Sequence, residues 1–418
     1  MAEAIRVLHF ADVHIGMENY GKTDADSGLS SRVVDFLRRM DEMVDYARDN
    51  DVDLVIFAGD AFKTRNPNPT YQREFAWRIQ DLAELAPVVM LVGNHDLPPN
   101  ALKASSIEIY DTLRVPNVFI AHEYDVFDVE TKRGRVVIGS APYPIRSRLM
   151  QETDLVGRTI RDTDQLLEET LGRLLVKLAD DADALAGDDT PRIMTGHFTV
   201  HGAVLGSERN VMLGRDVQVS LSLLADPRWD YVALGHIHKY QNLTPDRDEL
   251  PDVVYSGSLE RIDFGEENDS KGFCWVSLAR HQTAYEYVRV LARPMVTLRA
   301  DCRTEAYPTR TVTKLIRESK LEDAIVRVII ELTPETNASL KDGFLRRELL
   351  DAGVFHIAGI KRNIERPERA RLGTNPEGLT HEELLERYLI SREITPEQRA
   401  LLNELAREIM APQSVEGD

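Results

Sequence analysis

The chain has few cysteines and no long apolar segment, and these absences exclude several classes of protein. Its two cysteines, Cys274 and Cys302, cannot form a disulfide framework, and they lack the spacing of a thiolate zinc site. No apolar run approaches the ~18 residues of a membrane helix, and the first six residues lack the features of a signal peptide. We therefore expect a cytoplasmic protein whose metal ions, if it binds any, are held by nitrogen and oxygen atoms.

Positive charge is also scarce. The chain has 51 Lys and Arg against 70 Asp and Glu, a net charge of −19, which argues against coating of nucleic acid through the overall field. Residues 301–370 are nearly neutral, however, and they include Lys361, Arg362, Arg366 and Arg369. A nucleic-acid partner would need such a local patch, or metal ions, to offset the acidic body. The alternative interpretation of these four residues is a solvated surface.

The composition predicts a globular protein with more than one folding unit. Of the 418 residues, 43% are hydrophobic and 29% charged, and the length exceeds what one ordinary core holds. Short apolar runs followed by polar or glycine-containing turns predict strands, and apolar residues at helical spacing predict helices. The predicted strands are 5–10, 53–57, 88–92, 192–195, 231–234 and 253–255, and the predicted helices are 33–47, 69–86 and 160–186. This alternation predicts a layered α/β domain.

The remaining pattern predicts further units along the chain. We expect strands at 133–138, 272–278 and 285–290 in a second sheet, and the first domain to span 1–293. Residues 294–362 predict a small α+β domain, with strands 296–299, 325–332 and 354–360 and helices 309–318 and 338–350. Proline and glycine predict a linker over 363–379. Capping-box patterns at Thr380 and Thr395 predict two helices within 380–411.

Five turns that follow predicted strands concentrate metal-ligand residue types. Because the carboxyl ends of strands form one rim of an α/β sheet, these side chains can converge despite wide sequence separation. Glycine before a ligand allows a tight backbone turn. The candidate residues are Asp12 and His14, Asp60 after Gly59, Asn94, His95 and Asp96 after Gly93, His197 after Gly196, and His236 and His238 after Gly235.

The number of candidate ligands favours two divalent ions over one structural zinc. Imidazole, carboxylate and amide oxygen suit manganese, iron or zinc, and seven ligands exceed what one tetrahedral ion uses. Asp60 is the natural bridge. We expect Asp12, His14 and His238 around one ion, and Asn94, His197 and His236 around the other. Two such ions can activate water and clamp a phosphoryl group during an in-line displacement.

The Asp12–His14, Gly59–Asp60 and Gly196–His197 motifs each occur often by chance, whereas residues 93–96 and 235–238 form more specific motifs. Not every histidine belongs to the site. His9 lies within a predicted strand and is expected in the core or behind the ligands. We expect His122, His281, His356 and His381 on the surface or in packing contacts.

Together the five motifs resemble those of the calcineurin-like metallophosphoesterase superfamily over residues 5–290. That resemblance implies a two-sheet sandwich flanked by helices. More narrowly, residues 235–239, 253–265, 271–273 and 293–294 resemble the SbcD-type family of DNA double-strand-break repair nucleases. The narrower resemblance implies a manganese-dependent enzyme that trims DNA from the 3′ side and cuts single-stranded or hairpin DNA.

The resemblance also implies roles for individual residues. The seven candidate ligands fall on family ligand positions, and His95 falls on the catalytic histidine, which protonates the leaving oxygen or stabilises the transition state. Asp96 is then expected to orient His95. Lys63 departs from the family, which often has His or Asp there; lysine cannot replace imidazole in proton transfer, but it could hold a DNA phosphate.

The resemblance implies partners as well. We expect 294–362 to be a DNA-binding capping domain, and the helices of 380–411 to dock on the coiled coil of an SbcC-type, SMC-like ATPase. The alternative is that these two helices pair with each other or fold back on the capping domain. A homodimer is expected through helices at 71–85 and 105–113, where Phe75, Trp77, Ile79 and Ile109 are large and apolar; the alternative is that these residues pack on their own sheet. The alternatives are a small-molecule phosphodiesterase or phosphomonoesterase, and a scaffold that binds DNA or an ATPase without cutting.

Overall fold

A computed structural model describes residues 3–98, 103–149, 160–206, 216–245, 249–365, 380–392 and 394–410. The chain divides into two compact units. The first contains Met1–Thr297, Lys320–Arg327 and Leu349–Gly359, and the second contains Leu298–Ser319, Val328–Glu348 and Ile360–Asp418. Among the described residues, no helix is long and apolar enough to cross a membrane.

The first unit is built on two six-stranded sheets. One has the order β14-β13-β1-β2-β3-β4, in which β1 to β4 are parallel and β13 and β14 are antiparallel additions at one edge. Its strands are β1 (Ile5–Phe10), β2 (Leu54–Phe57), β3 (Val88–Leu91), β4 (Val118–Ala121), β13 (Gly272–Leu278) and β14 (Ala284–Arg289).

The other sheet has the order β11-β12-β10-β7-β6-β5, with β12, β10, β7 and β6 parallel and β11 and β5 antiparallel at the edges. Its strands are β5 (Asp125–Thr131), β6 (Gly134–Ala141), β7 (Arg192–His197), β10 (Tyr231–Gly235), β11 (Gln241–Asn242) and β12 (Asp252–Tyr255). Each sheet therefore contains four parallel strands, whose carboxyl ends are available for a site.

Our placement of strands 272–278 and 285–290 in a second sheet was wrong. They belong to the sheet of β1, where β13 pairs directly with β1 and Leu8 lies opposite Trp275. The physical reason is that β13 is buried on both faces: Phe273 and Trp275 pack under the helices, whereas Cys274 and Val276 pack between the sheets. A strand that is apolar throughout carries no signal of which neighbour it joins.

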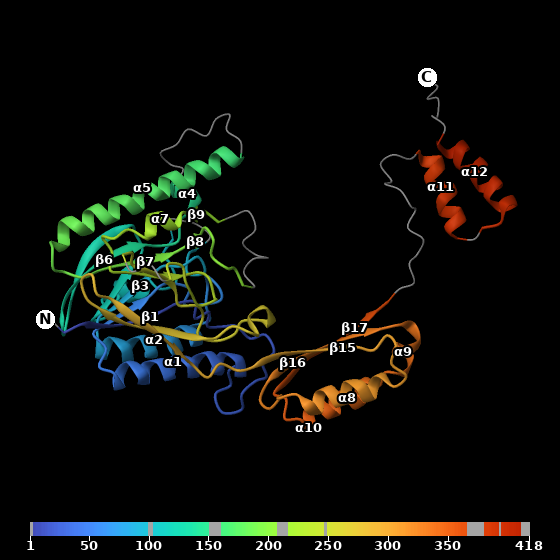
Figure 1. Cartoon of the computed structure of the whole chain (residues 1–418), viewed down its shortest axis with the longest axis horizontal. Helices are drawn as coiled ribbons and strands as arrows, with labels where there is room; N and C mark the ends of the chain where they lie inside the picture. The colour runs from blue at the N-terminus through green and yellow to red at the C-terminus, as the bar shows by residue number, and fades with distance from the viewer. Residues whose placement is uncertain are drawn as a thin grey trace, which may run out of the picture. The chain divides into compact units, whose positions relative to one another are not determined.

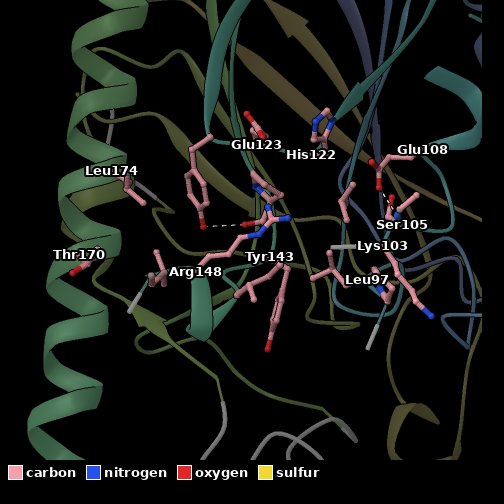
Figure 2. A pocket seen from close by; sticks show the side chains of 17 residues that line it. Leu97, Lys103, Ser105, Glu108, His122, Glu123, Tyr143, Arg148, Thr170 and Leu174 are labelled. Atoms are coloured by element: carbon pink, nitrogen blue, oxygen red, sulfur yellow. Dashed lines mark hydrogen bonds between the residues drawn. The ribbon is translucent and has the colours of Figure 1, made fainter. Parts of the chain in front are cut away.

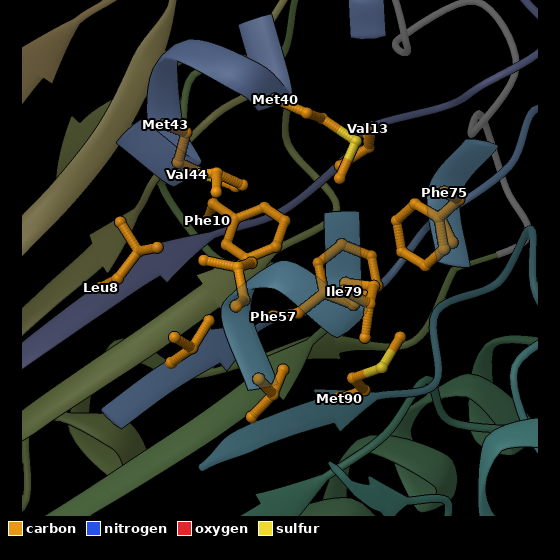
Figure 3. Close-up of a cluster of buried hydrophobic side chains, with 14 of the residues drawn as sticks. Leu8, Phe10, Val13, Met40, Met43, Val44, Phe57, Phe75, Ile79 and Met90 are labelled. Atoms are coloured by element: carbon orange, nitrogen blue, oxygen red, sulfur yellow. The ribbon is translucent and has the colours of Figure 1, made fainter. Parts of the chain in front are cut away.

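Helices cover both outer faces of the sandwich (Figure 1). Against the first sheet lie α1 (Ser31–Asp49) and α2 (Pro69–Leu85), and against the second lies α5 (Ile160–Ala186). Figure 3 shows Met40, Met43 and Val44 of α1 meeting Phe10 and other side chains of the sheet. The fold class is the layered two-sheet sandwich that we expected. Short elements complete this unit: α3 (Ile109–Thr112), α4 (Arg146–Leu149), α7 (Leu221–Leu224), β8 (Thr199–Val200), β9 (Gln218–Val219) and the 3₁₀ helix η1 (Phe264–Glu266).

The α2 helix corrects part of the expected dimer surface. Phe75 and Ile79 are fully buried beneath α2, and Phe75 packs against the rings of Phe57 and Phe62. Trp77 and Ile109 remain about half exposed, at 51% and 48%. Periodicity identified the apolar positions of the helix correctly, but it did not separate the face on the sheet from the face in solvent.

A third sheet comes next along the chain, with the order β15-β16-β17. Its elements are β15 (Met295–Asp301), α8 (Pro308–Glu318), β16 (Ile325–Leu332), α9 (Pro334–Ser339), α10 (Asp342–Asp351) and β17 (His356–Ile364). The single helix expected over 338–350 is wrong, because a capping box at Thr333 begins α9 earlier and α10 starts anew at Asp342. Of the expected basic patch, Arg362 pairs with Asp342 at 2.6 Å and Lys361 is exposed. Arg366, Arg369 and most of the expected linker, residues 366–379, lie outside the described residues.

Two helices lie near the end of the chain, α11 (His381–Ser391) and α12 (Pro396–Met410). The predicted capping box at Thr380 is present: Glu383 N donates to Thr380 Oγ1 at 3.2 Å, and Thr380 N donates to Glu383 Oε2 at 2.8 Å. The helices pair with each other, with Arg399 and Glu386 2.6 Å apart. Leu389 is buried, whereas large apolar side chains remain exposed at Tyr388, Ile390, Leu401, Leu402 and Leu405.

Candidate metal centre

All seven expected ligands meet at the carboxyl ends of parallel strands from both sheets. Asp12 and His14 follow β1, Asp60 follows β2 and Asn94 follows β3; His197 ends β7, and His236 and His238 follow β10. Strand register brings the turns together, since Phe10 pairs with Phe57 and Gly235 with His197. The site therefore joins the two sheets of the first unit.

The backbone at this site is unusual. Asp12, His14, Asp60 and His236 have positive φ angles of 53°, 48°, 64° and 94°. Non-glycine residues avoid this region at a cost of about 1–3 kcal/mol each, so the surrounding structure must impose it. Backbone bonds do so here, because Asp12 N donates to Gly59 O at 3.0 Å and His14 N to Asp60 O at 3.2 Å. The strained turns direct several polar side chains toward one point.

Two of the glycines that precede ligands are required by close approach. A Cβ at Gly93 would lie 2.2 Å from Asp60 Oδ1, and a Cβ at Gly59, whose φ is +97°, would lie 2.5 Å from His197 Nδ1. No side chain fits at such distances. The glycines thus allow the ligand-bearing turns to approach one another, as the sequence predicted.

Asp60 lies at the centre of the cluster. Its Oδ2 is 3.6 Å from His14 Nε2 and 3.4 Å from His197 Nε2, and its Oδ1 accepts the backbone N–H of His95 at 2.8 Å. The side chain is 2% exposed. A carboxylate between two sets of imidazoles has the geometry expected of a bridging ligand.

One set of donor atoms belongs to Asp12, His14 and His238. Nε2 of His14 and Nε2 of His238 are 3.0 Å apart, and the donor atoms of the three residues lie within 4.8 Å of one another. Two ring nitrogens approach this closely only where a proton or a cation lies between them. The chemistry of this donor set fits a divalent ion with nitrogen and oxygen ligands.

The other set belongs to Asn94, His197 and His236. Oδ1 of Asn94 is 3.0 Å from His197 Nε2 and 3.0 Å from His236 Nδ1. Nδ1 of His197 lies 2.7 Å from the carbonyl oxygen of Ala58 and therefore donates to it, which leaves Nε2 free to bind a metal. This set also fits a divalent ion.

Electrostatics support a need for cations at this point. Burial raises the pKa of Asp12, whereas for Asp60 the nearby histidines, with His197 foremost, outweigh burial and hold the pKa well below its usual range. Burial lowers the pKa of His14 well below its usual value. Although burial also lowers it, the pKa of His197 is raised to about 9 by the Asp60 carboxylate. The buried Asp60 carboxylate thus favours a positive charge on His197 beside it. A bound metal ion would supply that positive charge instead.

His95 and Asp96 lie together in the turn after β3, but they do not interact as expected. Nδ1 of His95 lies 2.8 Å from the carbonyl oxygen of Lys63, which holds the ring. The Asp96 carboxylate instead accepts the backbone N–H groups of Asp60, Ala61 and Gly93, at 2.9, 3.1 and 3.0 Å. Our expectation that Asp96 orients His95 was therefore wrong, because its oxygens are occupied in joining the β2 and β3 turns.

The contact with Lys63 also bears on the departure from the family at that position. The carbonyl oxygen that holds His95 is a backbone group, which any residue supplies. The donor atoms of His14, Asp60 and His95 lie within 4.8 Å of one another, so His95 is at the edge of the ligand cluster.

Residues behind the ligands were missed in the sequence. His236 Nε2 is 2.9 Å from Asp216 Oδ2, and Tyr143 donates to Asp216 Oδ1 at 2.8 Å. His238 Nδ1 is 2.9 Å from Glu266 Oε1. Only the family-like segments 253–265 and 271–273 lie close in sequence to Glu266. No motif in the sequence indicated Asp216.

A cavity of about 830 Å³ adjoins the cluster through Tyr143. Figure 2 shows Thr170 and Leu174 of α5 on one side of it, with Lys103, Ser105 and Glu108 on the other. Its lining mixes apolar and polar side chains, and it lies within the first unit.

The histidines expected outside the site are absent from the groups of clustered donor atoms among the described residues. His9 is fully buried, 3.1 Å from the Tyr231 hydroxyl and 3.2 Å from the Leu234 carbonyl oxygen, and burial lowers its pKa to about 3. His122 and His281 are exposed and His356 is half-buried. The side chain of His381 is not among those described.

Comparisons with known proteins agree with this geometry. The model of the calcineurin-like phosphoesterase family matches residues 5–240. The SbcD subunit of the nuclease SbcCD from Bacillus subtilis (strain 168) is 27% identical over 273 residues, which cover 64% of this chain and 64% of that protein. The chain thus matches about 64% of the length of this curated relative.

Two solved structures are also similar. The protein TT1561 of Thermus thermophilus is 13% identical with a TM-score of 0.34, and the match covers 68% of this chain and 100% of that one. A dimetal phosphatase from Danio rerio is 13% identical with a TM-score of 0.37, covering 68% and 99%.

Proposed function

The chain belongs to the calcineurin-like phosphoesterase family, and from this premise we propose that it is a metal-dependent DNA nuclease that processes double-strand ends with an SbcC-type ATPase. The similarity to a nuclease subunit over 64% of the chain supports DNA as the substrate. The expected activities are 3′–5′ exonuclease and endonuclease on single-stranded or hairpin DNA. A cavity of about 450 Å³ is lined by the ligand Asn94 and by His95, and its volume is that of pockets that hold small organic groups, which is compatible with a nucleotide next to the metals.

The observation that carries the proposal is the position of Asp60 between two ligand sets. We assign Asp12, His14 and His238 to one ion, Asn94, His197 and His236 to the other, and Asp60 to both. The proposed metal is manganese, which such nitrogen and oxygen ligands accept. Two bound ions would polarise the phosphodiester and lower the pKa of the attacking water.

The proton for the leaving oxygen is assigned to His95. Its Nδ1 donates to the Lys63 carbonyl and its backbone N–H to Asp60, so ring and backbone are both fixed beside the bridging carboxylate. The remaining ring nitrogen, Nε2, is the one that would carry the proton. Asp96 is assigned a supporting role, because its carboxylate joins the turns that bear Asp60 and His95.

The remaining assignments follow the domain order expected from sequence. We assign residues 1–293 to the nuclease domain, 294–362 to a DNA-binding capping domain, 363–379 to a linker and 380–411 to an ATPase-binding motif. The exposed apolar side chains of α11 and α12 support the last assignment, since their mutual packing leaves much apolar surface uncovered.

A homodimer is also proposed. The exposed Trp77 of α2 and Ile109 of α3 are the candidate contacts, now without Phe75 and Ile79. Light scattering on the wild-type chain and on Trp77→Glu with Ile109→Glu tests this. We expect a dimer for the first and a monomer for the second, and a wild-type monomer at micromolar concentration contradicts the proposal.

The function is tested by digestion of labelled hairpin and blunt duplex DNA with manganese, magnesium or chelator, beside a panel of nucleotide esters. We expect manganese-dependent cutting of DNA. Cleavage of the small esters alone would identify a small-molecule phosphodiesterase, and stoichiometric metal without any cleavage would identify a scaffold. Repeating the digestion with an SbcC-type ATPase measures the contribution of the partner.

A further inference from the structure

A buried ion pair lies directly behind one candidate ligand. Glu266 of η1 and Lys271, just before β13, are 0% and 2% exposed, and Lys271 Nζ is 2.7 Å from Glu266 Oε2. An isolated charge at such depth costs several kcal/mol, so a buried pair requires good geometry and full hydrogen bonding. Both residues lie within or beside the segments that resemble the narrower nuclease family, and neither belongs to the seven ligands.

The pair contacts His238 at two points. The other Glu266 oxygen, Oε1, is 2.9 Å from Nδ1 of the His238 ring. Lys271 Nζ donates to the backbone carbonyl oxygen of His238 at 3.0 Å. One ionic unit therefore holds both the ring and the main chain of the same residue.

The hydrogen bonds of the Lys271 ammonium group are saturated. Besides Glu266 and the His238 carbonyl, Lys271 Nζ donates to Ser258 Oγ at 2.8 Å, so its three N–H groups have three acceptors. Glu266 Oε2 also accepts the backbone N–H of Ile262 at 3.0 Å. Such saturation restricts the pair to one arrangement, as a positioning device requires.

The consequence for His238 is a fixed tautomer. Because Nδ1 faces a carboxylate, it carries the proton. Nε2, which lies 3.0 Å from His14 Nε2, is then the ring nitrogen whose lone pair can bind a metal ion. A carboxylate behind a ligating histidine also makes the ring more basic. In the other ligand set a carboxylate also lies behind one histidine, since His236 Nε2 is 2.9 Å from Asp216 Oδ2, whereas His197 Nδ1 faces the carbonyl oxygen of Ala58 at 2.7 Å.

We propose that Glu266 and Lys271 form a clamp that fixes the tautomer, ring orientation and backbone position of His238, and thereby set the affinity of the ion assigned to Asp12, His14 and His238. This inference rests on the two-metal centre of the proposed function. Both are positioning residues, since they act through His238. The segment between β12 and β13 thus acts on the metal centre through His238, although it supplies no ligand.

The test measures binding of manganese to chelator-stripped protein by titration calorimetry, together with thermal melting. Glu266→Gln should weaken one of the two ions about 10–100-fold and leave the other unchanged. Glu266→Gln with Lys271→Met removes both charges and so avoids a buried unpaired ion; its melting temperature should exceed that of the single variant while the weak binding persists. If the single variant does not fold, the double variant alone decides.

A matched control is Asp53→Asn. Asp53 is fully buried, lies 2.6 Å from Arg133 Nη1 and accepts Arg6 N at 2.8 Å at the start of β2, at the opposite end of that strand from Asp60. It should lower the melting temperature without changing metal affinity. Wild-type affinity for both ions in the folded double variant overturns the clamp, as does an equal loss of affinity in Asp53→Asn.

Because no DNA is present, the assay separates the inference from the proposed substrate. A wild-type chain that binds two ions but does not cut DNA overturns the nuclease and leaves the clamp intact. A wild-type chain that binds no manganese overturns both.

Discussion

Replacing Asp96 by alanine should reduce fold stability and metal binding, rather than proton transfer alone. The carboxylate is fully buried, and it accepts three backbone N–H groups from the two turns that carry Asp60 and His95. Removing it leaves those donors without an acceptor and separates the turns. The centre would then lose the fixed spacing between its bridging carboxylate and the residue assigned to proton transfer.

The magnitude depends on two opposing contributions. Three buried donors that lose their acceptor cost roughly 2 kcal/mol each, about 6 kcal/mol together. Burial, and next the Asp60 charge, raise the pKa of Asp96 to about 6. Asp96 is still ionised at pH 7, so its buried charge destabilises the fold. Removing that charge raises the free energy of unfolding by about 3 kcal/mol, at 1.36 kcal/mol for each pKa unit. The expected net loss is therefore about 3 kcal/mol.

The assay is urea unfolding of metal-free protein at pH 7, followed by tryptophan fluorescence. The three tryptophans, Trp77, Trp229 and Trp275, all lie in the first unit, so the signal reports that unit. Asp96→Asn is the matched variant: it keeps one acceptor oxygen and should lose less. If Asp96→Ala unfolds at the same urea concentration as the wild-type protein and only its rate of DNA cleavage falls, Asp96 does not hold the two turns together. Its role would then be to orient His95.

Asp60→Ala should lose both manganese ions together, by elemental analysis of the purified protein, because Asp60 lies between the two ligand sets. His9 should make the first unit less stable in acid. Its pKa is about 3 in the folded protein and 6.5 in the unfolded chain, so the unfolded chain binds the proton first as the pH falls. The free energy of unfolding is therefore highest above pH 6.5 and decreases below it. Between pH 7 and 5 this amounts to about 2 kcal/mol, and His9→Gln should lack it in urea titrations at the two pH values, whereas an equal acid loss in both proteins contradicts it. Leu401→Asp with Leu405→Asp should abolish binding of an SbcC-type ATPase in a pull-down and leave manganese-dependent cutting of short single-stranded DNA intact; binding at the wild-type level excludes this docking surface.

Much of the fold was predictable because its signals are local. Each of the six strands first identified is a short apolar run that ends in a polar turn, and each appears in the structure within a few residues. The ligand cluster was predictable for the same reason. Residues such as Asp12 and Asp60 stand directly after strands, and parallel strands place the residues at their carboxyl ends along one edge.

The features that the sequence did not reveal depend on contacts between distant segments. The apolar β13 gave no sign that it joins β1, and the partners of Asp96 are backbone groups, which leave no trace in residue types. Glu266 and Asp216 support ligands that lie 28 and 20 residues away. Lys63 attracted attention for its side chain, yet its carbonyl oxygen makes the contact with His95.

The most direct test of the account compares the wild-type chain with His95→Ala at equal manganese content. The measurement is the rate at which labelled nucleotides are released from duplex DNA. The variant should keep two ions and cut about 10²–10⁴-fold more slowly, because a single proton donor is lost while the metal centre remains. A variant that keeps both ions and cuts at the wild-type rate contradicts the assignment of the catalytic centre.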